Sequence, residues 1–212
     1  MIIIKNEYIT VKDMASAEIV EKRSRFIANV KPVSSEEEAL EFLNALRQKY
    51  WDARHNVYAY IVRENNIMRY SDDGEPSGTA GVPVLEMLKK ETLTDVIVVV
   101  TRYFGGILLG TGGLVHAYSK SAKEGIIAAG IKKMVLCRKF ILRCDYNMLG
   151  KVQYEVAGFA DAFCGESIYG EDVALEVYVT EDKEDAFVSM ITDKTNAAVK
   201  IEKCDVEYFE RD

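Results

Sequence analysis

A glycine-rich segment, residues 102–114, is one of two places where residue types and spacing suggest chemistry. It follows an apolar run and precedes a helical pattern, so its five glycines would turn the backbone sharply. Free N–H groups at a helix start favour an anion. The segment matches neither a P-loop nor a GxGxxG motif. Two interpretations therefore remain: a turn that packs the helix on the sheet, or a phosphate-binding site. The candidate anion-, RNA- or partner-binding residues are Arg102, Gly105, Gly106, Gly110, Gly112, Gly113, His116 and Tyr118.

A second group, Asp72, Asp73 and Glu75, lies in a segment rich in turn residues. Three carboxylates this close could hold a hard cation such as Mg²⁺, contact basic groups of a partner, or serve turns. Both groups follow a predicted strand and precede a predicted helix, and such loops can gather at one edge of an α/β sheet. We therefore expect a polar loop adjoining the glycine-rich segment, made up of His55, Arg69, Asp72, Asp73, Glu75, Ser77 and Thr79.

The strands that must position these residues are predicted from β-branched residues and alternation. In the first part of the chain they cover residues 2–9, 19–33, 57–63, 67–70 and 95–103. Asn65 and Asn66 tolerate positive φ, so they predict the tight turn of a hairpin. The aliphatic run 96–100 predicts a strand buried on both faces.

Three helices are predicted between these strands. Ser35 and Glu38 form a capping box at the start of the first. Ser77 or Thr79 is expected to cap a second, short helix with Pro83 in its first turn. The third follows the glycine-rich segment, ends at Gly130 and carries small residues at i, i+3, i+4 spacing. It should therefore lie close against the sheet.

The last 80 residues show a second pattern. Strands are predicted at 135–146, 162–168, 173–180 and 198–209, and helices at 149–159 and 181–192. This βαββαβ order is the ferredoxin-like split βαβ arrangement. We expect an antiparallel sheet with two helices on one face.

Composition and charge exclude several classes of protein. The chain has 212 residues, 49% of them hydrophobic and 29% charged, as in ordinary globular proteins. The longest aliphatic run is far shorter than the roughly 20 residues of a membrane span, and the start lacks the basic region of a signal peptide. Residues 1–132 carry 17 basic and 17 acidic residues, and residues 133–212 carry 10 and 17. Because duplex DNA binders usually show a basic excess, we expect no DNA partner. Because the chain shows neither a membrane span nor a signal peptide, we expect a cytoplasmic protein with no membrane partner.

The cysteines and histidines are too scattered for a zinc site. Cys137, Cys144, Cys164 and Cys204 form no CxxC pair, and the two histidines lie far apart in sequence. We expect reduced thiols and no cofactor. Cys137 and Cys144 are seven residues apart in one predicted strand, so they should point to opposite faces.

Taken together, the segments 71–81 and 102–118 resemble the signature of the IMPACT family, whose bacterial members are the YigZ-type proteins. Ser24-Arg25-Phe26 and residues 55–60 also fit this signature. The resemblance implies an α+β protein with two domains: residues 1–132 with a ribosomal protein S5 domain 2-like fold, and residues 133–212 with a ferredoxin-like fold. The same two folds occur in tandem in the ribosomal translocase, which implies contact with RNA or the ribosome.

The resemblance also sets limits on function. Eukaryotic relatives are implicated in translation control under amino-acid starvation and carry a further N-terminal interaction domain. This chain starts at the shared domain, so we do not carry that pathway over to it. His116 and Val82 stand where basic residues are frequent in the family, which weakens a phosphate-binding surface at neutral pH.

Three functions compete at this point. The leading hypothesis is a non-catalytic binding protein that contacts RNA, the ribosome or a translation-associated protein, in translation regulation or a stress response. The first alternative is an enzyme that binds a phosphorylated small molecule through the glycine-rich segment. Spacing alone offers no Ser/His/Asp triad and no Cys near a His for it. The second alternative is a protein–protein adaptor whose acidic C-terminal part docks on basic partners.

Overall fold

The computed structural model describes residues 6–211 and divides into two compact units. One unit is Tyr8–Lys132, and the other is Lys133–Asp212 together with the segment Met1–Glu7, as far as these are described. Asn6 and Glu7 belong to the C-terminal unit because the Leu136 amide donates to the Asn6 carbonyl at 2.7 Å and Lys133 pairs with Glu7 at 2.6 Å. Each unit is described by itself below.

The N-terminal unit holds an antiparallel sheet with strand order β2-β3-β6-β4-β5. Its strands are β2 (Ala15–Glu21), β3 (Ser24–Pro32), β4 (His55–Val62), β5 (Ile67–Ser71) and β6 (Val96–Tyr103). β1 (Glu7–Val11) precedes them, and the predicted residues 2–5 of that strand lie outside the described residues. The hairpin turn at Asn65-Asn66, which includes a short 3₁₀ turn (Glu64–Asn66), is confirmed, with φ of 56° and 53°.

The prediction of one strand over residues 19–33 is wrong. The chain turns at Lys22 and Arg23, whose φ values of 44° and 68° lie in the left-handed region. β2 and β3 are the two arms of this hairpin. Two charged residues in place of the usual Asn or Gly gave no turn signal in the sequence.

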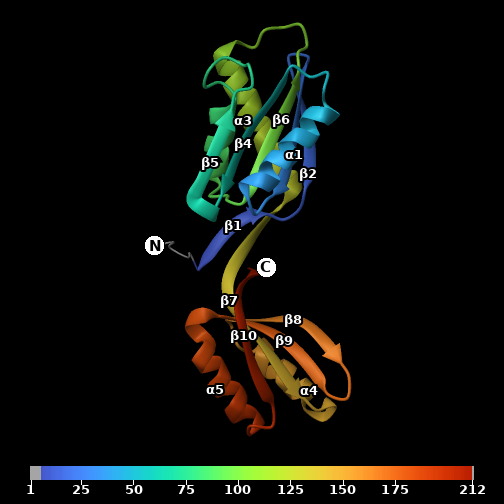
Figure 1. Cartoon of the computed structure of the whole chain (residues 1–212), viewed down its shortest axis with the longest axis vertical. Helices are drawn as coiled ribbons and strands as arrows, with labels where there is room; N and C mark the ends of the chain where they lie inside the picture. The colour runs from blue at the N-terminus through green and yellow to red at the C-terminus, as the bar shows by residue number, and fades with distance from the viewer. Residues whose placement is uncertain (1–5, 212) are drawn as a thin grey trace. The chain divides into compact units, whose positions relative to one another are not determined.

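Helices cover both faces of this sheet (Figure 1). α1 (Glu36–Lys49) packs on one face, and α2 (Gly81–Lys90) and α3 (Gly110–Ala129) pack on the other. Alternate residues of β6 therefore enter different cores: Val98 faces α2 and α3, whereas Ile97 and Val99 face α1. The prediction that this strand is buried on both faces is confirmed.

Of two local predictions for these helices, the capping box is confirmed in part and the close packing of α3 in full. The Glu38 amide donates to Ser35 Oγ at 3.2 Å, whereas the Glu38 carboxylate accepts from the Ser34 amide at 2.8 Å, one residue before the Ser35 amide of the motif. A Cβ on Gly125 would lie 2.8 Å from Val30 and 2.9 Å from Ala28, so α3 does approach the sheet closely. Helix-to-sheet distance is thus set by a residue without a side chain.

The C-terminal unit has the predicted βαββαβ order. Its elements are β7 (Ile131–Cys144), α4 (Tyr146–Ala157), β8 (Ala162–Tyr169), β9 (Val173–Thr180), a 3₁₀ turn (Glu181–Lys183), α5 (Glu184–Thr195) and β10 (Lys200–Arg211). β7 pairs antiparallel with β10 and β9, and β8 pairs with β9. β1 also pairs with β7.

One face of this second sheet forms a core with its helices. Phe140 and Leu142 of β7 pack there with Phe187 of α5 and with residues of α4. Cys144 joins this core, whereas Cys137 lies in a separate apolar cluster on the other face. The prediction that these two cysteines face opposite ways is confirmed. Within residues 6–211, no helix is long and apolar enough to cross a membrane.

Candidate functional site

The glycine-rich segment and the group formed by Asp72, Asp73 and Glu75 meet at one end of the N-terminal sheet. There Arg102 of β6 lies between Phe26 of β3 and His55 of β4, as their pairing shows. The segments that follow β5 and β6 both leave from this end. The sequence argument relied on a rule for parallel strands, but the sheet is antiparallel. The segments meet because β6 ends where β3 and β4 begin.

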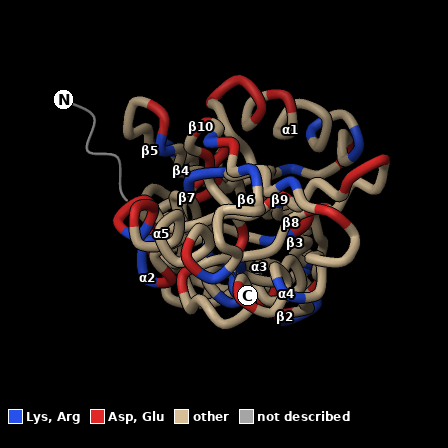
Figure 2. The backbone as a smooth tube through the Cα atoms, turned by 90° about the horizontal axis from the view of Figure 1, so that it is seen from below, with Lys and Arg blue, Asp and Glu red and all other residues tan. Residues whose placement is uncertain are grey.

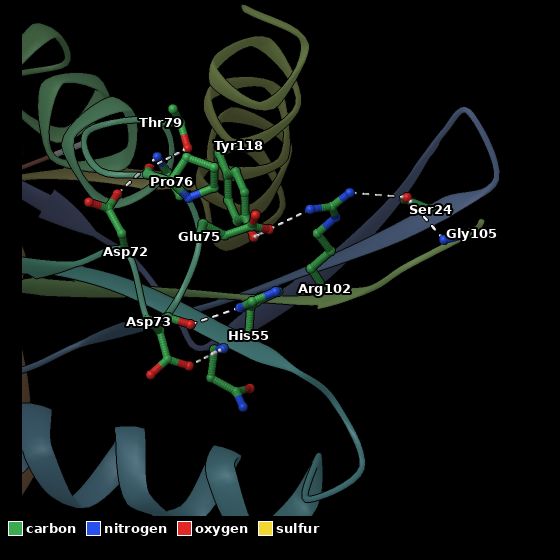
Figure 3. Close-up of polar contacts among 12 residues, drawn as sticks. Ser24, His55, Asp72, Asp73, Glu75, Pro76, Thr79, Arg102, Gly105 and Tyr118 are labelled. Atoms are coloured by element: carbon green, nitrogen blue, oxygen red, sulfur yellow. Dashed lines mark hydrogen bonds and ion pairs between the residues drawn. The ribbon is translucent and has the colours of Figure 1, made fainter. Parts of the chain in front are cut away.

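Glu75, Arg102 and Tyr118 form a buried triad at the centre of this site (Figure 3). Glu75 Oε1 accepts hydrogen bonds from Arg102 at 2.6 Å and from the Tyr118 hydroxyl at 2.8 Å. The Arg102 guanidinium lies 5.3 Å from the Phe26 ring centre. Burial, together with the charge of Glu75, raises the pKa of Tyr118 well above its usual range. The triad thus joins the polar loop, the end of β6 and α3 in one contact.

Asp72 fixes the start of α2. Its carboxylate accepts hydrogen bonds from the amides of Gly78, Ala80 and Gly81 at 2.8, 3.0 and 2.8 Å. The prediction that Ser77 or Thr79 caps this helix is therefore wrong. The Thr79 hydroxyl donates to the Pro76 carbonyl instead, at 2.7 Å. A carboxylate outside the helix does the capping because the loop folds back over the helix start.

Asp73 fixes the start of β4. One of its carboxylate oxygens accepts from the Asn56 amide at 2.6 Å, and the other lies 3.4 Å from Arg47. Its carbonyl lies 2.8 Å from His55 Nδ1, which donates to it. As Figure 3 shows, the carboxylates of Asp72 and Asp73 point in different directions, and Glu75 points to a third set of partners. The three do not form a shared oxygen cage, and no metal-holding group of His, Cys, Asp or Glu occurs among the described residues.

The glycine-rich segment combines packing with an open helix start. A Cβ on Gly105 would lie 2.1 Å from the Arg23 backbone, so only glycine fits there. The Gly105 amide donates to Ser24 Oγ at 3.1 Å. Gly106 and Gly110 have φ of 82° and 71°, whereas Gly112 has open space around it. The first turn of α3 has neither a side-chain cap nor an acidic residue. Gly113 lies in the same turn, where a Cβ would meet Leu109 at 3.1 Å.

Several predicted site residues lie outside the triad. His116 and Ser77 are exposed, and Arg69 lies on exposed β5, 3.8 Å from Glu36 of α1. The sequence argument left out Ser24 and Phe26, which contact the Arg102 and Gly105 region. Both stand in a motif noted for its family resemblance. Only the register of β3 with β6 reveals their place beside the triad.

The hollow beside these loops is mainly apolar. It has a volume of about 400 Å³ and lies between α2 and α3. Val82, Pro83, Met87 and Val115 contribute apolar side chains to its wall, with Glu86 and Lys90 also lining it. Close by in sequence, Phe104, Ile107 and Leu108 are exposed, Leu108 by 83%. The wall of the hollow is therefore mainly apolar with the exposed charges of Glu86 and Lys90 on it, while the charges of Glu75 and Arg102 are buried.

Comparison with known proteins places this pair of units in one family. Residues 22–126 match the model of the Impact N-terminal domain, and residues 142–198 match a domain of unknown function, DUF1949. The chain is 44% identical over 207 residues to IMPACT family member YvyE of Bacillus subtilis, covering 97% of this chain and 95% of that one. It is 32% identical over 183 residues to IMPACT family member YigZ of Escherichia coli, covering 85% and 89%.

A solved structure has a similar fold over nearly the whole chain. The crystal structure of a hypothetical protein matches with a TM-score of 0.61 and 28% identity, covering 95% of this chain and 99% of that chain. The protein therefore belongs to the IMPACT family and combines its N-terminal domain with a DUF1949 domain.

Proposed function

We propose that this IMPACT family protein is a non-catalytic cytoplasmic protein that binds RNA or the ribosome and acts in translation regulation or a stress response. We also propose that its two units have the S5 domain 2-like and ferredoxin-like folds, a pair found together in the ribosomal translocase. The observation that carries the proposal is the exposed start of α3. Its first turn offers backbone N–H groups with no cap and no acidic neighbour in the turn.

The hydrogen-bonded carboxylates of this loop support binding rather than chemistry. Asp72 caps α2, Asp73 holds β4, and Glu75 neutralises Arg102. Each of these side chains is engaged in fixing a loop, so none is left to act as an acid or base on a substrate. Arg102 anchors the glycine-rich segment through its pair with Glu75. A phosphate at the start of α3 would meet amides held in place by this anchoring.

A charge placed at the start of α3 tests the site. Thr111 is exposed in the first turn, so Thr111→Asp should keep or raise stability by complementing the helix dipole. The same carboxylate would repel a phosphate and should weaken RNA or ribosome binding by about tenfold or more at low salt. Thr111→Asn is the matched neutral control and should bind like wild type. His116→Arg should strengthen binding by adding a permanent charge nearby.

The measurement is the affinity of purified ribosomes and of single-stranded RNA for each variant over a range of salt concentrations. Urea unfolding of the same samples checks that the fold is intact. Equal affinities for Thr111→Asp, Thr111→Asn and wild type would exclude the start of α3 as a phosphate site.

The apolar hollow between α2 and α3 favours a second candidate function, a protein–protein adaptor. Its Val82, Met87 and Val115 side chains suit an apolar segment of a partner. Val115→Gln adds no charge, so it should weaken such docking while leaving RNA affinity unchanged. Ribosome binding that is sensitive to Val115→Gln but not to Thr111→Asp would favour a protein on the ribosome as the contact.

A further inference from the structure

The C-terminal sheet carries a row of aromatic rings on the face that its helices leave open. Phe163 of β8 lies opposite Tyr178 of β9, and Tyr178 lies opposite Lys139 of β7. Phe209 of β10 lies opposite Val135. Because alternate residues of a strand point to opposite faces, these side chains face away from the core that Phe140 forms with α4 and α5. We name Phe163, Tyr178 and Phe209 the aromatic face.

The rings of the aromatic face are nearly parallel and stacked. Tyr178 and Phe209 have centroids 4.2 Å apart at an angle of 22°, and Phe163 and Phe209 have centroids 5.9 Å apart at 19°. Tyr178 is buried, whereas Phe163 and Phe209 keep part of their surface exposed. On the same face Ile168, opposite Ala174, is 60% exposed. Solvent therefore reaches part of the Phe163 and Phe209 rings and the Ile168 side chain on this face, whereas the Tyr178 ring is covered.

Cations lie beside these rings. The Arg211 guanidinium is 5.6 Å from the Phe163 ring centre, and Lys139 Nζ is 5.6 Å from that of Tyr178. Glu176 Oε1 forms an ion pair with Lys139 Nζ at 2.7 Å, and Glu176 Oε2 accepts a hydrogen bond from the Tyr178 hydroxyl at 3.3 Å. Arg143 lies on the same face of β7, with Ile141 between it and Lys139, and is 3.8 Å from Asp172. Ring faces next to guanidinium and ammonium groups complement a nucleotide, which has a flat base and a charged phosphate.

The charge of the unit decides which nucleic acid suits this face. Residues 133–212 carry 10 basic and 17 acidic residues, so broad phosphate neutralisation along a duplex is not available. Figure 2 shows Lys and Arg interspersed with Asp and Glu along the backbone of the chain. Stacking on a sheet needs unpaired bases, since paired bases already stack on one another. A four-stranded sheet with aromatic side chains on its open face is a recurring way to hold such bases.

We propose that the aromatic face binds unpaired bases of single-stranded RNA by stacking, with Arg211 and Lys139 beside the phosphates. This deepens the proposed function by naming single-stranded RNA as the ligand, and it rests on that function. It adds a second contact, on the C-terminal unit, that is independent of the start of α3.

Replacing the rings with apolar side chains that have no ring tests the proposal. Phe163→Leu and Phe209→Leu keep an apolar side chain but lose the ring, whereas Phe163→Tyr and Phe209→Tyr keep it. The probes are a short single-stranded oligouridine and an abasic ribose-phosphate oligomer of equal length. We expect the full-length protein to bind oligouridine more tightly than the abasic oligomer, and each Leu variant to lose about 5- to 150-fold of the oligouridine affinity. The Tyr variants should bind within about twofold of wild type.

Unfolding curves identify a Leu variant that has lost its fold, in which case the other ring position gives the result. Equal affinity of wild type for oligouridine and the abasic oligomer would overturn the proposal. So would folded Leu variants that bind oligouridine as wild type does.

The Thr111→Asp variant separates the two contacts. Loss of affinity in Thr111→Asp alone would keep the proposed function and reject the aromatic face. Loss in the Leu variants alone would keep the aromatic face and reject the start of α3.

Discussion

Each unit contains a triad made of a basic side chain, a glutamate and a tyrosine, and the two triads lie in very different settings. In the N-terminal unit Arg102, Glu75 and Tyr118 meet with an ion-pair distance of 2.6 Å and a hydroxyl hydrogen bond of 2.8 Å. In the C-terminal unit Lys139, Glu176 and Tyr178 meet with corresponding distances of 2.7 and 3.3 Å. The side chains of the Arg102–Glu75 pair are 7% and 4% exposed, against 25% and 18% for Lys139–Glu176.

Burial and sequence separation give these triads different roles. Glu75 lies 27 residues from Arg102 and 43 from Tyr118, so the first triad ties distant segments together. The second joins neighbouring strands, and Glu176 and Tyr178 are only two residues apart. A buried charge that loses its partner is costly, whereas water can solvate one near the surface. The first triad therefore maintains the site, and the second remains available to a ligand.

The largest expected effect comes from breaking the buried pair. Arg102→Met would leave the Glu75 carboxylate buried without its cation and should lower the free energy of unfolding by about 3–5 kcal/mol. Adding Glu75→Gln to Arg102→Met should restore part of this loss, because the amide is neutral and still accepts from Tyr118. Urea unfolding of the single and double variants measures both effects. A double variant less stable than Arg102→Met would contradict this account of the triad.

The next effect concerns the buried hydroxyl. Tyr118→Phe removes a hydrogen bond to a charged group and should cost about 1.5–3 kcal/mol near neutral pH. Because burial and Glu75 raise the pKa of Tyr118, this phenol stays protonated in the folded protein when it ionises in the unfolded chain near pH 10. Its contribution is full below that pH and is lost as pH rises above it, by about 1.4 kcal/mol per pH unit.

The Tyr118→Phe variant should therefore lose less stability than wild type between about pH 10 and pH 11.5. Unfolding in urea across this range measures the difference, and other tyrosines contribute equally to both proteins. Tyr178→Phe is the matched control from the second triad. It should change both the free energy of unfolding near neutral pH and the pH dependence of that free energy less than Tyr118→Phe does. Parallel stability curves for Tyr118→Phe and wild type would show that Tyr118 ionises as freely in the folded protein as in the unfolded chain.

Local signals allowed much of the fold to be predicted from the sequence. The Ser35–Glu38 cap, the Asn65-Asn66 turn and the βαββαβ order depend on residues within a few positions of one another. The turn at Lys22-Arg23 was missed because its two residues are not typical of left-handed backbone. Sequence thus predicted elements well where turn chemistry was typical and failed where tertiary pairing imposed the turn.

Most residues of the site were predicted from the sequence, but their hydrogen-bond partners were not. The proximity of the glycine-rich segment to Asp72, Asp73 and Glu75 was expected, whereas the structural role of each carboxylate was not. Asp72 accepts from amides six to nine residues ahead, and Glu75 reaches Arg102 across 27 residues. These partners depend on how the loop folds over α2 and β6, which no spacing rule encodes. The aromatic face was missed because its three rings come from three separate strands.

The smallest expected effect on stability is that of Lys139→Met in the partly exposed triad. Glu176 keeps contact with water and with the Tyr178 hydroxyl, so losing the cation should cost no more than about 1 kcal/mol. The hydrogen bond with Glu176 raises the pKa of Lys139 above its usual range, so the lysine is charged at every pH suitable for RNA binding. Lys139→Met should therefore weaken oligouridine binding and reduce its salt dependence, while stability changes little. Urea unfolding and RNA titration at two salt concentrations test both. Lys139→Met could instead lose nearly as much stability as Arg102→Met and keep its RNA affinity. The charge of Lys139 would then stabilise the fold and would not contact a ligand, so the two triads would have the same structural role.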